Sequence, residues 1–183
     1  RERGPESMNL ADDPFTLFGL PPRMALDRAA LDECWRRLQG EVHPDRFAAE
    51  GAAAQRVAMQ WAVRVNEAYA ILKDPLRRAE CLCGLRGVPV QAERHTDMPA
   101  GFLMQQMAWR EALDDAATDG NAAAVQALAD DVTAQERQTL AHVQSLLDDV
   151  GDVPAAAQQV RVLMFLQKFR RDIDRRLDAL ESP

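Results

Sequence analysis

The chain has 183 residues, 47% of which are hydrophobic, so it can bury a core in one domain or in two small ones. Only 5% of the residues are aromatic, and alanine, leucine and charged residues dominate, a composition that favours helices over sheets. The 22 basic residues face 29 acidic ones, giving a formal net charge of -7, so a phosphate-neutralising surface could only be a local patch. We therefore expect an all-helical protein that has no nucleic-acid partner.

The cysteines and the apolar runs indicate in which cellular compartment the protein is expected. The three cysteines, Cys34, Cys81 and Cys83, are odd in number and have no framework of spacings, which fits a reducing environment. No apolar run approaches the roughly 20 residues of a membrane span, and the N-terminus lacks the apolar segment of a signal peptide. We expect a cytoplasmic protein without a membrane partner, and we set residues 1–12 apart as an N-terminal extension or a cloning remnant.

Capping residues and prolines mark the first helices. Asp13 and Pro14 suit the cap and the first position of a short helix over 14–20, which the two following prolines would stop. Asp27 can cap a second helix. This helix would run to residue 42 and bury one face, because its apolar residues recur at helical spacing: Leu31, Cys34, Trp35, Leu38 and Val42.

A proline also ends the second helix. Pro44 biases His43 away from helical backbone, so we expect His43-Pro44-Asp45 to lie in a turn. A third helix over 49–72 would return antiparallel to the second, and another Asp-Pro pair would open a fourth helix over 75–85. The third helix is predicted to bury a matching stripe of Val57, Trp61, Val65, Ala68 and Leu72.

The second half of the chain is predicted to be a separate domain. Residues 86–98 contain glycine and proline without sustained periodicity, as in a linker. Three longer helices follow, at about 99–118, 121–150 and 155–181, and their short connections predict a three-helix bundle over 99–183. The last two helices carry the apolar stripes Val125, Leu128, Val132, Val143, Leu146 and Leu147, and Val162, Leu166, Phe169, Ile173, Leu177 and Leu180.

The tripeptide His43-Pro44-Asp45 is the first functional candidate. It lies in the loop of the predicted hairpin, and Asn66 and an Asp-Pro break follow it in the order expected for a J domain. Residues 13–85 therefore resemble the J domain, which stimulates ATP hydrolysis by DnaK-class chaperones through this loop and the basic face of its second helix. The resemblance implies that the chaperone is bound by His43, Pro44, Asp45, Arg36, Arg37 and Arg46. The alternative is a surface histidine in an unrelated helical bundle.

The chemistry of the loop suits docking. Proline makes the loop rigid at little entropic cost, Asp45 offers two acceptor oxygens to an arginine, and His43 can donate or accept a hydrogen bond. Arg36 and Arg37 flank the face opposite the buried stripe and can steer a partner electrostatically. The patch is thinner than in many J domains, because Gly40 and Glu41 occupy places that often hold Lys or Arg.

The layout of the whole chain narrows the family. No Gly/Phe-rich segment or zinc module separates the J-like half from the bundle, and the chain contains Phe15-Thr16-Leu17-Phe18-Gly19-Leu20, Arg78-Ala79-Glu80 and Phe102-Leu103-Met104. In these features it resembles the iron-sulfur co-chaperone family HscB over nearly its whole length. The resemblance implies an L-shaped arrangement, a bacterial cytoplasmic location, and two partners, the DnaK-class chaperone HscA and the iron-sulfur scaffold IscU.

The predicted helix over 99–118 has two apolar faces. Phe102, Gln106, Trp109 and Leu113 cluster on one side and can pack in the bundle. The opposite side carries Leu103, Met104, Met107, Glu111 and Asp115, a methionine-containing apolar surface with acids at one end. The family resemblance implies scaffold binding by Leu103, Met104, Met107, Glu111, Asp115 and Phe165, with one acidic contact missing at Ala108. The alternative is that this face is buried against a helix or a second copy of the chain.

No catalytic or metal-binding pattern is expected. The sequence contains no Gly-rich phosphate loop and no nucleophile elbow, so we predict a protein that is not an enzyme and needs no cofactor. Cys81 and Cys83 would point about 200 degrees apart on a helix, which is poor geometry for one metal ion. Three alternatives stay open: a J-domain co-chaperone for a different client, a helical interaction module without chaperone function, and a weak homodimer.

Overall fold

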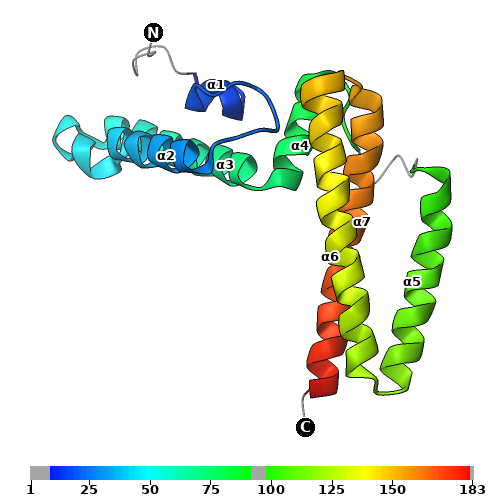
Figure 1. Ribbon diagram of the computed structural model, residues 1–183. Coiled ribbons are helices and arrows are strands. Elements are labelled where there is room, and N and C mark those ends of the chain that lie inside the picture. Colours follow the sequence, from blue (N-terminus) through cyan, green and yellow to red (C-terminus); the bar gives the residue numbers. More distant parts are fainter. Residues whose placement is uncertain (1–8, 92–97, 182–183) are drawn as a thin grey trace. The chain divides into compact units, whose positions relative to one another are not determined.

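The computed structural model describes residues 9–91 and 98–181, and every regular element in these ranges is a helix (Figure 1). The all-helical prediction is therefore confirmed. In chain order the helices are α1 (Pro14–Phe18), α2 (Arg28–Val42), η2 (Pro44–Glu50), α3 (Ala52–Lys73), α4 (Pro75–Leu85), α5 (Ala100–Thr118), α6 (Ala122–Ser145), η3 (Leu146–Val150) and α7 (Val153–Glu181).

The chain divides into two compact units, Arg1–Leu82 and Cys83–Pro183, and the division falls within α4. Residues 1–8 of the predicted extension and 92–97 of the predicted linker lie outside the described residues. Across the two described ranges, none of the helices has both the length and the apolarity of a membrane span.

Helix α1 begins as predicted and ends earlier. An oxygen of Asp13 accepts hydrogen bonds from the amides of Phe15 at 2.9 Å and Thr16 at 3.0 Å, which caps the helix. Gly19 then adopts left-handed backbone with φ of 65°, and the amide of Leu20 donates to the Phe15 carbonyl at 2.9 Å. Because glycine enters this conformation without a Cβ clash, the helix stops at Gly19 and not at the prolines.

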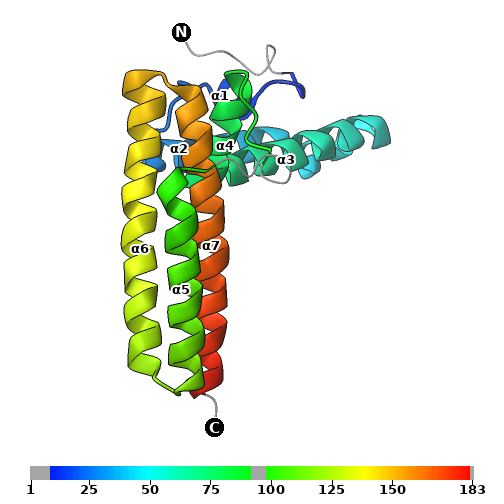
Figure 2. The same ribbon diagram turned by 90° about the vertical axis from the view of Figure 1, so that its right-hand side faces the viewer.

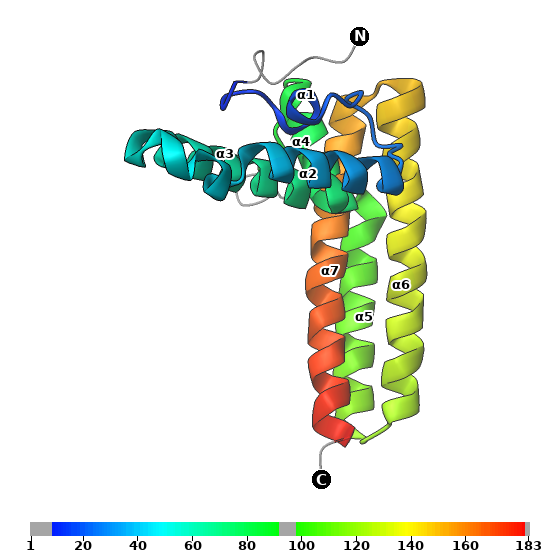
Figure 3. The ribbon, with the colours of Figure 1, turned by 90° about the vertical axis from the view of Figure 1, so that its left-hand side faces the viewer.

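Helices α2 and α3 lie side by side as the predicted hairpin (Figures 1 and 3). Asp27 caps α2 through hydrogen bonds to the amides of Ala29 and Ala30, as expected. The residues buried in the hairpin are Leu31, Cys34, Leu38 and Val42 on α2, and Ala58, Val65, Ala68 and Leu72 on α3. Trp35 and Trp61, which we predicted to lie in the buried stripes, are only half-buried.

The predicted stripe on α3 is wrong at its first position. Val57 is 52% exposed, and Ala58 is buried in its place. Val57 shares a helix face with Arg64, two turns further on, whose guanidinium donates to the carbonyl oxygens of Leu10 at 3.1 Å and Asp12 at 2.6 Å. The N-terminal segment therefore covers this face at Arg64 but leaves it open at Val57.

Arg78 on α4 ties together three parts of the first unit. The residue is only 9% exposed. Its Nε donates to the Leu72 carbonyl at 2.7 Å, and its Nη1 donates to the Met24 carbonyl at 2.6 Å. The guanidinium thus satisfies a carbonyl at the end of α3 and holds the segment between α1 and α2 against α4.

Helices α5, α6 and α7 run alongside one another as the predicted three-helix bundle (Figure 2). The apolar residues predicted for the middle helix are buried: Val125, Leu128, Val132, Val143, Leu146 and Leu147. The predicted single helix over 121–150 is wrong at its end, where residues 146–150 form the π-helix η3. The wider turn of a π-helix allows two consecutive leucines, Leu146 and Leu147, to be buried together. The amide of Gly151 donates a 2.8 Å hydrogen bond to the Leu146 carbonyl and so ends this turn.

The first residues of the predicted linker pack on the second unit. Val90 is 2% exposed, and its carbonyl oxygen accepts a hydrogen bond from the buried Arg161 at 2.9 Å. Arg86 donates to the Leu147 carbonyl at 2.5 Å, at the wide turn of η3. Periodicity fails to detect these contacts because they depend on single backbone carbonyls and not on an apolar stripe.

Candidate functional sites

The His-Pro-Asp loop connects α2 to α3, but it is not a simple turn. His43 has the extended backbone that its neighbour Pro44 demands, with φ of -61° and ψ of 126°. Pro44 then begins the 3-10 helix η2, so the predicted turn is corrected to a short helix and α3 begins at Ala52 instead of residue 49. The side chains of His43 and Asp45 are 55% and 91% exposed.

The imidazole of His43 caps η2. Its Nδ1 accepts a hydrogen bond from the Asp45 amide at 3.3 Å. A neutral imidazole in this arrangement carries its proton on Nε2, which is then available as a donor to another molecule. The same Nδ1 lies 3.6 Å from a carboxylate oxygen of Asp45. The hydrogen bond from the Asp45 amide to the ring therefore holds the two polar residues of the motif in one arrangement.

The three arginines predicted to bind a chaperone differ in their surroundings. Arg46 donates from Nη1 to the carbonyl oxygen of Gly40 at 2.9 Å. Arg37 forms an ion pair with Glu41 at 3.4 Å. Glu41 therefore weakens the basic face twice, because it replaces the Lys or Arg that many J domains have at this place and also pairs with Arg37. Arg36 is exposed and forms no ion pair within the described part of the chain. Arg36 thus carries the charge that is most available to a partner.

An aromatic and polar ladder joins α2 to α3 outside the buried core. The rings of Trp35 and Tyr69 are stacked with centroids 4.8 Å apart, and Trp35 Nε1 donates to the side-chain oxygen of Asn66 at 3.0 Å. The same oxygen accepts from Gln39 at 2.5 Å. This ladder gives Asn66 a structural role, because its side-chain oxygen fixes two side chains of α2, Trp35 and Gln39.

Helix α5 presents the predicted apolar face to solvent. Leu103, Met104 and Met107 are 63%, 76% and 65% exposed, and the acids Glu111 and Asp115 are also exposed. The opposite side packs in the bundle as predicted, with Phe102 and Leu113 buried and Gln106 and Trp109 half-buried. Burial of the exposed face, with Leu103, Met104 and Met107, against a helix of the same chain is therefore wrong, whereas burial against a second copy stays open. Apolar residues this exposed are typical of a protein-binding surface.

Phe165 lies at the rim of the bundle core. It is half-buried, with its ring edge-to-face with Phe102 at 5.4 Å and stacked with Phe169 at 5.7 Å. The guanidinium of Arg110 lies 5.5 Å from the Phe165 ring centroid, within the range of a cation-π contact. Phe165 can therefore contact a partner with only part of its ring.

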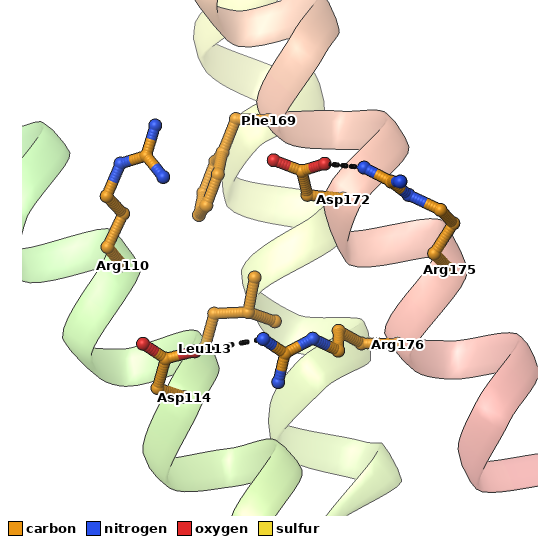
Figure 4. Close-up of a pocket in the computed structure, with 7 residues that line it drawn as sticks. All are labelled: Arg110, Leu113, Asp114, Phe169, Asp172, Arg175 and Arg176. Atoms are coloured by element: carbon orange, nitrogen blue, oxygen red, sulfur yellow. Dashed lines mark hydrogen bonds and ion pairs between the residues drawn. The ribbon is translucent and has the colours of Figure 1, made fainter.

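A cavity of about 470 Å³ opens between α5 and α7, beside this aromatic cluster (Figure 4). Figure 4 shows side chains of the two helices facing each other across it. Asp172 is paired with Arg175, and Arg176 reaches Asp114 at 3.2 Å, so most of the charge in the cavity is paired internally. The lining residues are Arg110, Leu113, Asp114, Phe169, Asp172, Arg175 and Arg176.

Neither the cavity nor Arg110 was predicted from the sequence. A signal was present, because Leu103, Met107, Arg110 and Asp114 are separated by 4, 3 and 4 residues and therefore share one stripe of α5. Apolar periodicity does not reveal this stripe, because its second half is charged. It places the cavity next to the exposed apolar residues.

The cysteines are not arranged as a metal site. Cys34 and Cys83 are buried and Cys81 is half-buried. Burial raises the pKa of the thiols of Cys34 and Cys81, which disfavours the thiolate that metals and oxidants require. Across residues 9–91 and 98–181, no three His, Cys, Asp or Glu side chains are grouped so as to hold a metal ion.

Comparison with known proteins settles the family. The chain is 48% identical over 175 residues to a co-chaperone protein HscB homolog of Burkholderia multivorans, covering 96% of this chain and 99% of that protein. It is 49% identical over 174 residues to the HscB homolog of Burkholderia thailandensis, with 95% and 99% covered. The chain belongs to the HscB co-chaperone family. The family model described as the HSCB C-terminal oligomerisation domain matches residues 98–174.

Solved structures support the same fold. HscB from Vibrio cholerae matches with a TM-score of 0.78 and 38% identity, over 92% of this chain and 99% of that one. Human HscB matches with a TM-score of 0.84 over 95% of this chain and 90% of that one, and at 24% identity this likeness concerns the fold alone. The predicted architecture, a J domain followed by a C-terminal three-helix bundle, is confirmed. The roles of individual residues remain predictions.

Proposed function

We propose that this HscB-family co-chaperone binds an IscU-type iron-sulfur scaffold through α5 and stimulates the ATPase of a DnaK-class chaperone, HscA, through its His-Pro-Asp loop. We infer that it does so in the bacterial cytoplasm. The observation that carries the proposal is the exposure of Leu103, Met104 and Met107 in a chain that also holds an exposed His43-Pro44-Asp45 loop. One protein thus combines a client-binding surface with an ATPase-docking loop.

The loop offers chemistry that suits an ATPase surface. The Asp45 carboxylate, 91% exposed, can accept two hydrogen bonds from one arginine. His43 offers its Nε2 hydrogen as a donor, because Nδ1 is occupied by the Asp45 amide. Arg36 adds a charge that speeds encounter with an acidic partner. The loop would favour the hydrolysis-competent arrangement of the chaperone without taking part in the chemical step.

The α5 face offers chemistry that suits a protein client. Two methionines and a leucine form an adaptable apolar centre, and full burial of such a side chain contributes about 1.5–3 kcal/mol. Glu111 and Asp115 continue the face with negative charge and favour basic groups at the rim of the client surface. Ala108 contributes no charge, so this co-chaperone would bind its client with one acidic contact fewer than family members that have an acid at this position.

Coupling of the two surfaces explains why one chain carries both. A client held on α5 stays close to any chaperone that docks on the loop, so the second binding event becomes effectively intramolecular. The chaperone then meets its client at a local concentration far above that in solution, while the loop promotes ATP hydrolysis. No catalytic group in the co-chaperone is needed for this effect.

The client assignment is tested by a triple variant and a matched control. Replacing Leu103, Met104 and Met107 by alanine should weaken IscU binding by at least a hundredfold in isothermal titration calorimetry. The control replaces Val57, Met59 and Val63 of α3, which are 52%, 61% and 55% exposed, and should keep wild-type affinity. Intact IscU binding in the α5 variant would overturn the client surface. If the wild type stimulates HscA but binds no IscU, a different client is indicated.

The chaperone assignment is tested independently. His43→Gln removes the ring that caps η2 and should abolish stimulation of the HscA ATPase while IscU binding stays unchanged. Full stimulation by this variant would contradict the role of the loop.

A second candidate role for α5 is self-association. The family model that matches residues 98–174 is described as an oligomerisation domain, and the exposed apolar face is available to a second copy. Sedimentation equilibrium would detect a weak homodimer, and titration with IscU should dissociate it if both use α5. A dimer that persists at saturating IscU would place self-association on another surface.

A further inference from the structure

Arg46 reaches back across the His-Pro-Asp loop. Its guanidinium Nη1 donates to the Gly40 carbonyl oxygen at 2.9 Å, and its amide donates to the His43 carbonyl oxygen at 3.0 Å. The side-chain bond joins the residue after the loop to the last turn of α2, so the chain from 40 to 46 is closed into a ring. The whole His-Pro-Asp motif lies within this ring.

The end of α2 needs such a donor. The last four carbonyl groups of a helix have no partner within the helix, and the last turn of α2 contains no basic residue. Pro44 lacks an amide hydrogen and cannot supply one. The guanidinium of Arg46 satisfies one of these carbonyls and places positive charge at the negative end of the α2 dipole.

The loop is therefore held at two points. On one side the Arg46 guanidinium joins it to α2, and on the other the His43 ring accepts the Asp45 amide at 3.3 Å. A hydrogen-bonded ring restricts the positions that the exposed carboxylate of Asp45 can adopt before it meets a partner. Less ordering entropy is then lost on docking.

We propose that Arg46 is a positioning residue of the docking loop, which closes the ring to Gly40 and thereby presets Asp45 and His43. The inference rests on the proposed function, in which the loop docks on an ATPase. This positioning role differs from a steering role, in which only the charge of Arg46 matters. Arg36 provides the comparison, because it is an exposed arginine of the same unit without a hydrogen bond to the loop.

Two matched variants separate the roles. Arg46→Met and Arg36→Met each remove one positive charge and keep an apolar stem, but only the first opens the ring. Amide hydrogen exchange in the free protein should be about threefold to tenfold faster for residues 45–47 in Arg46→Met. The same amides should exchange at the wild-type rate in Arg36→Met. Docking to a partner does not influence these rates, because no partner is present.

The ATPase assay adds a second readout. Arg46→Met should lower the maximum stimulation of HscA, because the misplaced loop remains misplaced at saturation, whereas Arg36→Met should only raise the half-saturating concentration. Unchanged exchange in Arg46→Met would overturn the proposal, and so would full recovery of maximum stimulation at saturating co-chaperone. If the wild type itself fails to stimulate HscA, the proposed function fails, and the exchange rates still decide whether Arg46 closes the ring.

Discussion

The hydroxyl of Tyr69 on α3 donates to the carboxylate of Asp32 on α2 at 2.8 Å. This hydrogen bond, followed by one from Arg28, lowers the pKa of Asp32, although burial acts in the opposite direction. Tyr69 also stacks on Trp35, so a single side chain connects the polar and the aromatic parts of the ladder. The two helices that flank the His-Pro-Asp loop are thus fixed in register outside the core as well as inside it.

Tyr69→Phe tests this connection. The variant keeps the stacked ring and removes the hydroxyl, so the pKa of Asp32 should rise toward its ordinary value, which NMR titration of the carboxyl carbon would measure. Since a depressed pKa stabilises the fold above the unfolded-state pKa, the variant should be less stable than the wild type at neutral pH. The difference should shrink as the pH falls through the folded-state pKa of Asp32. An unchanged Asp32 titration would contradict the bond.

Arg78→Met tests the buried link between α4, α3 and the segment before α2. The change leaves the carbonyl groups of Leu72 and Met24 without this donor, so the free energy of unfolding should fall by about 2–4 kcal/mol. Urea denaturation followed by circular dichroism measures the loss. Arg77→Met, at the exposed neighbouring position, is the control and should change the stability by less than about 0.5 kcal/mol. Equal stability of the two variants would contradict a structural role of Arg78.

The starts of α1, α2 and α4 were predictable because they depend on a capping residue nearby in the sequence, whereas α3 begins after Gly51 without a side-chain cap. Asp13, Asp27 and Asp74 each accept hydrogen bonds from amides two and three residues ahead, as expected for capping residues. Helix ends were less predictable because competing signals overlap. Near the end of α1, Gly19 and the following prolines both suit a stop, and the structure uses the glycine.

The candidate sites also have one part that the sequence predicts and another that it does not. The two apolar faces of α5 follow from helical spacing, whereas the exposure of Leu103, Met104 and Met107 comes from the structure. The bond from Arg46 to Gly40 could not be predicted, since a charged side chain beside a loop has the same sequence signal whether it meets a partner or a backbone carbonyl. The exposure of Val57 has a similar cause, because it depends on where the N-terminal segment stops covering α3.

Glu136 on α6 predicts a distinct pH dependence. Burial raises its pKa, and the nearby Arg170 only partly offsets the rise. A raised carboxyl pKa means that the ionised form is disfavoured in the fold, so this group reduces stability at neutral pH, and the loss is recovered as the pH falls through the folded-state pKa. Glu136→Gln should therefore be more stable than the wild type at pH 7, by less than about 1 kcal/mol because the group is partly solvated.

The pH profile serves as its own control. The advantage of Glu136→Gln should diminish on acidification and disappear below the ordinary glutamate pKa, which thermal unfolding at a series of pH values would reveal. A stability difference that is constant with pH would mean that the substitution acts through packing and not through the charge.

Phe165 should affect both folding and client binding, because it is half-buried and packs against Phe102 and Phe169. Phe169→Ala removes a 1% exposed ring and should lower the free energy of unfolding by about 3–5 kcal/mol. Phe165→Ala should cost less, about 1–3 kcal/mol, since part of its ring already meets water. Leu103→Ala, at a 63% exposed position, should change stability by less than about 0.5 kcal/mol.

The three variants together distinguish residues that contact the client directly from residues that only support α5 by packing. If Phe165 contacts the client directly, Phe165→Ala should weaken IscU binding even at temperatures where chemical denaturation shows it to be fully folded, as Leu103→Ala should. Phe169→Ala, when equally folded, should bind with nearly the wild-type affinity, because its ring is enclosed by the bundle. Equal losses of affinity in the two phenylalanine variants would mean that Phe165 acts by supporting α5 and does not contact the scaffold.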